Sequence, residues 1–142
     1  MLIRRETDRD TDVIRAVTTA AFARGRSPGQ LPPEARLIDE LRAGPAWLPA
    51  LSLVAVTPAG EAIGHVLGTR GHVGQHPVIA LGPLAVRPDR QQNGVGSALM
   101  HAVYQIVPPE PQWQPHFQVR VLSAYHPRLR GTFTYPEPFD RT

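Results

Sequence analysis

The chain has 142 residues, with 15 basic and 12 acidic side chains and a formal net charge of +3. It contains no cysteine, which excludes disulfides, thiolate metal ligands and cysteine nucleophiles. No apolar run approaches the ~18 residues that a membrane-spanning helix needs, and no apolar secretory segment follows the first residues. We therefore expect a cytoplasmic protein with a single domain at residues 1–142.

The isoelectric point of about 10.2 does not indicate a nucleic-acid partner. All 15 basic residues are arginine, so the value reflects the very high pKa of the guanidinium group more than an excess of charge. The arginines are scattered and form no stripe with interleaved aromatic residues. The six histidines lack the paired spacing of metal ligands, and the sequence predicts no metal site.

Hydrophobic periodicity and turn signals predict an α+β arrangement for the N-terminal half. Thr7 or Asp8 can cap the first helix, whose first turns are rich in aspartate, as the helix dipole prefers. Pro33 begins the second helix and Gly44 ends it. In chain order we expect a strand at 1–5, a helix from 7 or 8 to about 22, a helix at 33–44, a strand at 48–57 and its hairpin partner from 62 to about 70.

The most informative stretch begins with an apolar strand predicted at residues 78–86. A proline-closed turn and the loop QQNGVG at 91–96 follow, and then a helix whose apolar positions recur every three or four residues. The first turn of a helix has unpaired N–H groups and a partial positive charge, and glycines let a phosphate approach the main chain. The pattern predicts a site for a phosphorylated ligand. Arg87 and Arg90 flank the loop and either add positive potential or belong to a solvated surface.

Two common phosphate-binding motifs do not fit this stretch. The dinucleotide fingerprint GxGxxG fails because Leu99 occupies the third glycine position, and seven residues separate the strand from Gly94. The motif GxxxxGK[ST] fails because the chain has no lysine.

The strand end LAV and the run RPDRQQNGVGSALM resemble the acetyl-CoA pyrophosphate loop of the GNAT superfamily of N-acyltransferases, in its bacterial branch of predicted acetyltransferases. The order of elements from Leu2 to about Tyr104 is similar to the front of that fold, a three-layer α/β/α arrangement with a mixed, mostly antiparallel sheet. The resemblance implies acetyl-CoA as co-substrate, with loop amides on the pyrophosphate and the strand edge along pantetheine. Carried over, the cofactor-binding residues are Leu84, Ala85, Val86, Gln91, Gln92, Asn93, Gly94, Val95, Gly96 and Ser97.

After Tyr104 the resemblance breaks. The family continues with a fifth strand and a helix that carries an acid tyrosine, whereas here four prolines fall within residues 108–115. The tail, with a strand predicted at 117–122 and the run GTFTYPEPF, again resembles the end of the same branch. We interpret this as an internal deletion of roughly thirty residues between a core at 1–107 and a proline-rich C-terminal part at 108–142. A strand edge left open would favour homodimerisation or aggregation.

No catalytic residue can be assigned from the sequence. An amine acceptor with a pKa of roughly 10.4 needs a base, but residues 78–86 contain no carboxylate. His65 is the nearest candidate by topology, with the filling of a strand face as the alternative. His72 and His76 are expected in a connecting segment, either bordering an acceptor pocket or solvated. Packing is expected of Tyr104, Trp47 and Trp113, with a ligand role as the alternative for the two tryptophans. Tyr125 is not assigned the role of the acid, because the tail resembles the segment beyond the family's catalytic helix.

Two hypotheses follow for the function. The first is an acetyl-CoA-dependent N-acetyltransferase that acts on a small-molecule or peptide amine and binds neither nucleic acid nor membrane. The second is an inactive remnant of that family that persists as a CoA-binding or protein-interaction module. The interrupted C-terminal half distinguishes them, because it would carry the opposing wall of the site and the acid.

Overall fold

The computed structural model describes residues 1–107 and 133–134. The predictions made for the proline-rich segment, for the strand at 117–122 and for Trp113 and Tyr125 lie outside the described residues.

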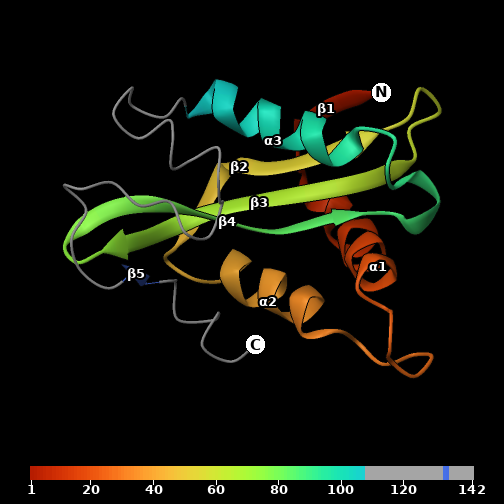
Figure 1. Ribbon diagram of the computed structural model, residues 1–142, viewed down its shortest axis with the longest axis horizontal. Helices are drawn as coiled ribbons and strands as arrows, with labels where there is room; N and C mark the ends of the chain where they lie inside the picture. The colour runs from red at the N-terminus through yellow and green to blue at the C-terminus, as the bar shows by residue number, and fades with distance from the viewer. Residues whose placement is uncertain (108–132, 135–142) are drawn as a thin grey trace.

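The described helices and strands follow the predicted order (Figure 1). They are β1 (Leu2–Arg5), the 3-10 turn η1 (Asp8–Asp10), α1 (Thr11–Ala21), α2 (Pro33–Arg42), β2 (Trp47–Val56), β3 (Ala62–Val73), β4 (His76–Val86), the 3-10 turn η2 (Pro88–Arg90), α3 (Val95–Ile106) and β5 (Phe133–Thr134).

The strands form one antiparallel sheet in the order β1-β2-β3-β4. The short β5 pairs with the end of β3 beyond the part that β2 covers, at His72 and Val73. Among the described residues, β4 therefore has a strand partner on one side only. This edge borders the predicted phosphate loop.

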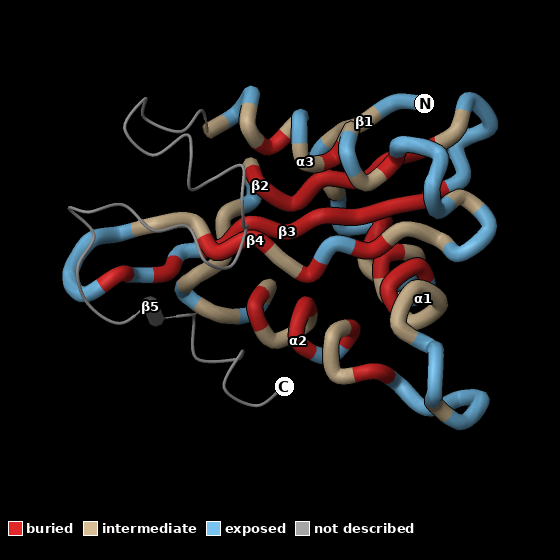
Figure 2. The backbone as a smooth tube through the Cα atoms, in the orientation of Figure 1, coloured by how far each residue is buried: buried red, intermediate tan, exposed pale blue. Residues whose placement is uncertain are grey.

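Helices cover both faces of the sheet, α1 and α2 on one side and α3 on the other (Figure 1). Alternate residues of the central strands feed two apolar clusters, one with Val54 and Leu67 under α1 and α2, the other with Leu53 and Val66 under α3. Buried segments accordingly run along β2 and β3, while the turns at both ends are exposed (Figure 2). The three-layer α+β prediction is confirmed.

The glycines that interrupt β3 allow α3 to lie close to the sheet. A Cβ atom added at Gly64 would stand 3.0 Å from side-chain atoms of both Val95 and Leu99. Any larger residue at Gly64 would push these two residues, and with them the N-terminal half of α3, away from β3. This close packing holds the start of α3 beside the end of β4.

Two details differ from the sequence predictions. The β3–β4 hairpin is longer than expected, because its turn takes only Gly74 and Gln75 and pairing continues to Val73 and His76. His72 and His76, expected in a connecting segment, therefore lie on strands. The first helix also starts later, at Thr11, after the 3-10 turn η1.

The predicted cap at Thr7 acts on that turn. The Thr7 N–H donates to the carboxylate of Asp10 at 2.7 Å, and the Asp10 N–H donates to the Thr7 carbonyl at 2.9 Å. Arg4 binds the same carboxylate through two nitrogens at 2.7 and 3.0 Å. The turn therefore ties the start of α1 to β1. None of the described helices is long and apolar enough to span a bilayer.

Candidate functional site

The free edge of β4 ends in main-chain groups that point away from the sheet. The Arg87 N–H donates to the Ile63 carbonyl at 2.8 Å, and Ala85 pairs with His65 on β3. In an antiparallel pair, main-chain groups alternate between the partner strand and the opposite side. The N–H and C=O groups of Leu84 and Val86 therefore face outward, whereas those of Ala85 are directed at β3.

The loop after β4 presents further unpaired donors. Gly94 is the N-terminal cap of α3 and has φ +84°, the left-handed region that favours glycine. The first intrahelical hydrogen bond runs from the Ala98 N–H to the Gly94 carbonyl at 3.0 Å. The N–H groups of Val95, Gly96 and Ser97 precede it and have no intrahelical acceptor. The first turn of α3 contains no acidic residue, so its dipole leaves this end open to an anion.

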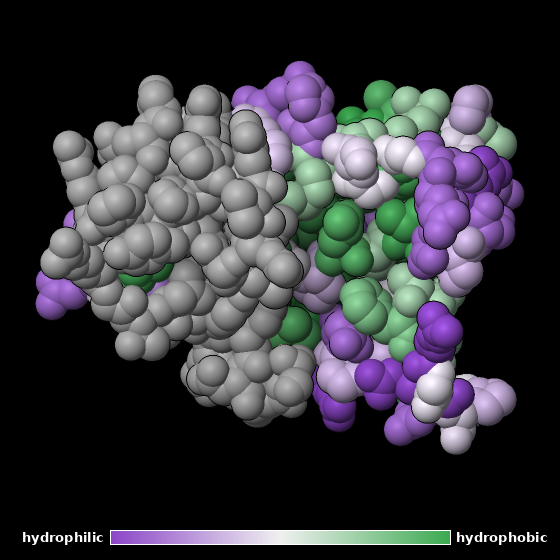
Figure 3. Space-filling view, in the orientation of Figure 1, coloured by the Kyte–Doolittle hydropathy of each residue, from purple (hydrophilic) through white to green (hydrophobic). Residues whose placement is uncertain are grey.

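The strand edge and the helix start form one continuous surface. A Cβ atom added at Gly96 would lie 3.7 Å from side-chain atoms of Leu84 and of Val86, an ordinary contact distance. The Leu84 side chain is exposed at this junction. Figure 3 shows apolar side chains across the middle of this face and hydrophilic ones at the end where β4 leads into α3.

The charged side chains of the loop largely neutralise one another. Arg87 donates to the Asp89 carboxylate at 2.6 and 3.0 Å and lies 3.7 Å from Glu61. The Arg87 hydrogen bond lowers the pKa of Asp89. Arg90 approaches the same aspartate at 3.9 Å. The positive potential of the loop therefore rests mainly on its main-chain N–H groups.

Gln91 is the one predicted loop residue whose side chain is bound to the β4 edge. Its Nε2 donates to the Val86 carbonyl at 3.0 Å across the turn η2. Of the outward-facing groups at Leu84 and Val86, this carbonyl thus already accepts one hydrogen bond.

His65, the candidate base, lies in a buried polar network beneath α2. Its side chain is fully buried, and its Nε2 lies 2.8 Å from the Ser52 hydroxyl. The Ser52 hydroxyl donates to Oε2 of Glu6. The Glu6 carboxylate also accepts two hydrogen bonds from Arg42, at 2.8 Å on Oε1 and 3.3 Å on Oε2. Arg42 in turn lies over the Trp47 ring, 5.3 Å from its centroid.

The network determines the protonation of its members. Because a carboxylate only accepts, the Ser52 proton points to Glu6, and the Ser52 oxygen accepts from Nε2 of His65. Nδ1 of His65 is buried and has no hydrogen-bond partner among the described residues, so it carries the bare lone pair of a neutral ring.

The pKa shifts agree with this arrangement. Burial lowers the pKa of His65, against the raising effect of Glu6. Burial alone would raise the pKa of Glu6, but the nearby His65 ring, whose Nε2 lies 3.5 Å from the carboxylate, and hydrogen bonds from Arg42 and Ser52 outweigh it and lower the pKa to about 2.

Sequence analysis missed this network because its members are far apart in the chain. The available signals were single polar residues in apolar surroundings: Ser52 within LSLVAV, His65 within AIGHVL, and Glu6 directly after the first strand.

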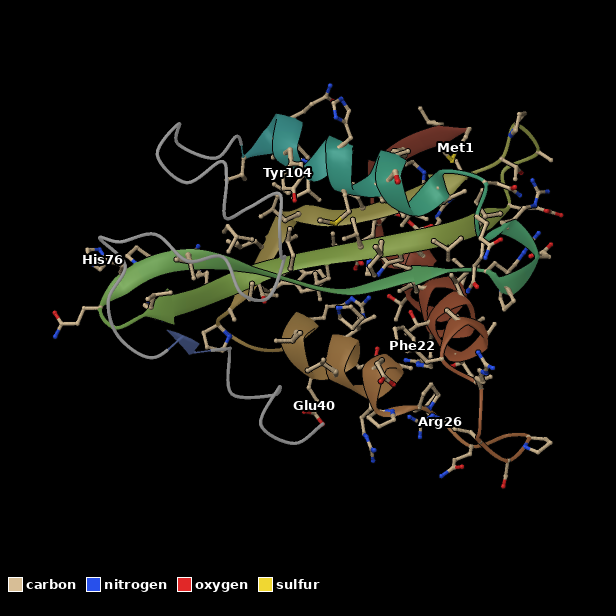
Figure 4. The ribbon with its side chains drawn as sticks, in the orientation of Figure 1. Met1, Phe22, Arg26, Glu40, His76 and Tyr104 are labelled. Carbon is tan, nitrogen blue, oxygen red and sulfur yellow. The ribbon has the colours of Figure 1, made fainter. Side chains whose placement is uncertain are left out.

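The histidine candidates His72 and His76, and also Tyr104, lie away from the loop. His76 begins β4 at the tip of the hairpin, about 33 Å of strand from Val86 (Figure 4). His72 is exposed on the neighbouring strand. Tyr104 lies near the C-terminal end of α3, and burial raises its pKa. The described residues contain no cluster of His, Asp or Glu that could hold a metal ion.

These features define a strand edge, a glycine loop and a helix start on an acyl-CoA N-acyltransferase fold. Residues 14–110, more than half of the chain, match the acetyltransferase (GNAT) family. The chain belongs to this family.

One sequence relative is YjhQ of Escherichia coli K12, an uncharacterised N-acetyltransferase. It is 38% identical over 95 residues, which cover 64% of this chain and 48% of YjhQ. The chain thus spans about half the length of that relative.

Two solved structures have a similar fold. A GNAT family acetyltransferase from Brucella melitensis in complex with acetyl-CoA has a TM-score of 0.74 and 28% identity, over 98% of this chain and 97% of that chain. The GNAT family N-acetyltransferase YhbS from Escherichia coli, in complex with CoA, has a TM-score of 0.66 and 22% identity, over 99% of this chain and 92% of that chain.

Proposed function

We propose that this protein transfers the acetyl group of acetyl-CoA to an amine. The observation that carries the proposal is the set of N–H groups on Val95, Gly96 and Ser97, which have no intrahelical acceptor and lie beside the outward-facing edge at Leu84 and Val86. A diphosphate needs several donors at short range, and an extended chain with amide groups needs a free strand edge. Acetyl-CoA contains both parts in one molecule, and the Brucella relative binds it.

Within this proposal the residues of the loop have different roles. The main-chain N–H groups of residues 92–97 bind the diphosphate, and Leu84 and Val86 pair with the pantetheine arm. Ala85 supports the edge from within the sheet, because its own main-chain groups are directed at β3. The exposed Leu84 side chain provides an apolar contact for the arm.

The chemistry follows from holding the thioester beside an amine. The nitrogen attacks the carbonyl carbon, a C–N bond forms, the C–S bond breaks, and CoA leaves as its thiol while the amine loses a proton. Positioning and oriented main-chain donors supply the acceleration, and β4 itself offers no carboxylate as a base. His65 is too deeply buried to contact an amine directly.

Isothermal titration with acetyl-CoA and with CoA tests the binding, and thermal unfolding tests it independently, because a ligand of the folded state raises the melting temperature. Binding together with acetylation of a panel of amines supports the proposal. Absence of binding at millimolar acetyl-CoA contradicts it. Binding without turnover on the panel supports the alternative, an inactive CoA-binding module.

The same edge of β4 would also pair two copies of the chain. A homodimer built on it would compete with pantetheine for Leu84 and Val86. Acetyl-CoA is therefore expected to shift such a dimer to monomer, which analytical ultracentrifugation with and without ligand can measure.

A further inference from the structure

The side chain of Gln91 is engaged with the protein and not directed at a ligand. Its amide donates to the Val86 carbonyl at 3.0 Å, although Gln91 itself is exposed. The bond spans η2, so it joins the last residue of β4 to the first residue of the loop.

This hydrogen bond changes what the strand edge offers to an extended ligand. Leu84 keeps its outward N–H and C=O, and Val86 keeps its outward N–H. The Val86 carbonyl accepts one hydrogen bond from Gln91 and keeps a second lone pair, whose direction is limited by that bond. Beyond Val86, a chain that pairs along β4 meets the donors of the loop.

We propose that Gln91 is a positioning residue for CoA, an inference that rests on the proposed function. By binding the Val86 carbonyl, it fixes the separation between the strand edge, which takes pantetheine, and the N–H groups of Val95 to Ser97, which take the diphosphate. The two halves of one CoA molecule then bind at the same time. Gln91 acts through Val86 and does not touch the ligand.

The test compares whole CoA with its two halves. Gln91→Met keeps the length of the side chain and removes the donor. Titrations use CoA, pantetheine without a diphosphate, and adenosine 3′-phosphate 5′-diphosphate without pantetheine. The matched control is Gln75→Met at the exposed turn between β3 and β4, far from the loop.

If Gln91 positions the two halves, Gln91→Met weakens CoA binding by about fivefold or more, because one hydrogen bond and the alignment of two linked sites are lost. Binding of each half then changes less than twofold, the melting temperature without ligand stays within about 1 °C, and Gln75→Met behaves as wild type in every titration.

Three results overturn the inference. Unchanged CoA affinity in Gln91→Met shows that the bond positions nothing. An equal loss for CoA and for the adenosine diphosphate half shows direct contact with the phosphates. A lower melting temperature with proportional losses for all three ligands shows a structural role alone. Failure of the wild type to bind CoA is a separate result, since it overturns the proposed function itself.

Discussion

The polar groups beneath α2 and those at the start of α3 differ in where their hydrogen bonds go. Under α2, Glu6, Ser52 and His65 are nearly or fully buried and bind one another and Arg42. At the start of α3, the donors of Gly96 and Ser97 are main-chain groups with no intrahelical acceptor.

The buried network is therefore expected to contribute to stability, and the main-chain donors at the start of α3 to ligand binding. Charged side chains in a buried network are costly to break, because each lost partner leaves an uncompensated polar group. Main-chain donors at a helix start cost little while water satisfies them, and they remain available for an anion. The residues with the most perturbed pKa values therefore belong to the part of the protein that is proposed not to touch the ligand.

The largest effect is expected from Glu6→Ala, which leaves Arg42 without its main partner and Ser52 without an acceptor. We expect a loss of about 3 kcal/mol in the free energy of unfolding, measured by urea denaturation. Glu61→Ala is the matched control, because Glu61 is exposed and lies 3.7 Å from Arg87, and it should cost less than about 0.5 kcal/mol. A similar cost for both variants would remove the distinction between the two regions.

Acid should weaken the same region. The pKa of Glu6 is lowered from 4.5 to about 2, so the folded state gains stability above the unfolded pKa and loses it as the pH falls from about 5 towards 2. The full difference corresponds to about 3 kcal/mol.

The variant Glu6→Gln should remove most of this acid-dependent loss, as followed by urea titrations at several pH values. A second contribution to the loss of stability in acid remains in this variant, because the hydrogen bond from Arg4 lowers the pKa of Asp10 to about 2. Asp10→Asn should remove that contribution. Identical acid profiles for the wild type and Glu6→Gln would show that the carboxylate is not held by the network.

On the binding side, Gly96→Asp should weaken CoA binding by about a hundredfold, because the new carboxylate faces the diphosphate. Space at Gly96 is sufficient, since an added Cβ makes only ordinary contacts at 3.7 Å. Gly96→Asn has the same shape without the charge and should lose far less. Isothermal titration of both folded variants with CoA measures this difference. Equal CoA affinities for Gly96→Asp and Gly96→Asn would show that the diphosphate binds elsewhere.

The smallest effect is expected from Arg87→Ala. Its guanidinium is already compensated by Asp89 and Glu61, so CoA affinity should fall by less than about threefold at 0.15 M salt. Asp89→Ala should strengthen binding slightly, because it releases Arg87. A tenfold loss in Arg87→Ala would show that side-chain charge, and not the main chain, dominates the loop.

Local patterns in the sequence were sufficient for the elements around the loop. The apolar strand, the glycines and the helix spacing from Val95 to Ile106 predicted β4, the loop and α3 in the correct order. These features depend on neighbours within a few residues, so the chain itself records them. The prediction of a connecting segment at His72 and His76 was wrong, because pairing across a two-residue turn extends both strands beyond their apolar runs.

By itself the sequence determined the order of the elements around the loop, since that order follows from residue types at short spacing, and its resemblance to the GNAT superfamily indicated the family. Only the tertiary structure decided that His65 is buried with Ser52 and Glu6, that the main-chain groups of Ala85 are directed at β3, and that Gln91 donates to the Val86 carbonyl. The physical reason is that these features depend on strand register and on contacts between residues as many as 46 positions apart. Tertiary packing brings such residues together, and a local sequence pattern does not predict these contacts.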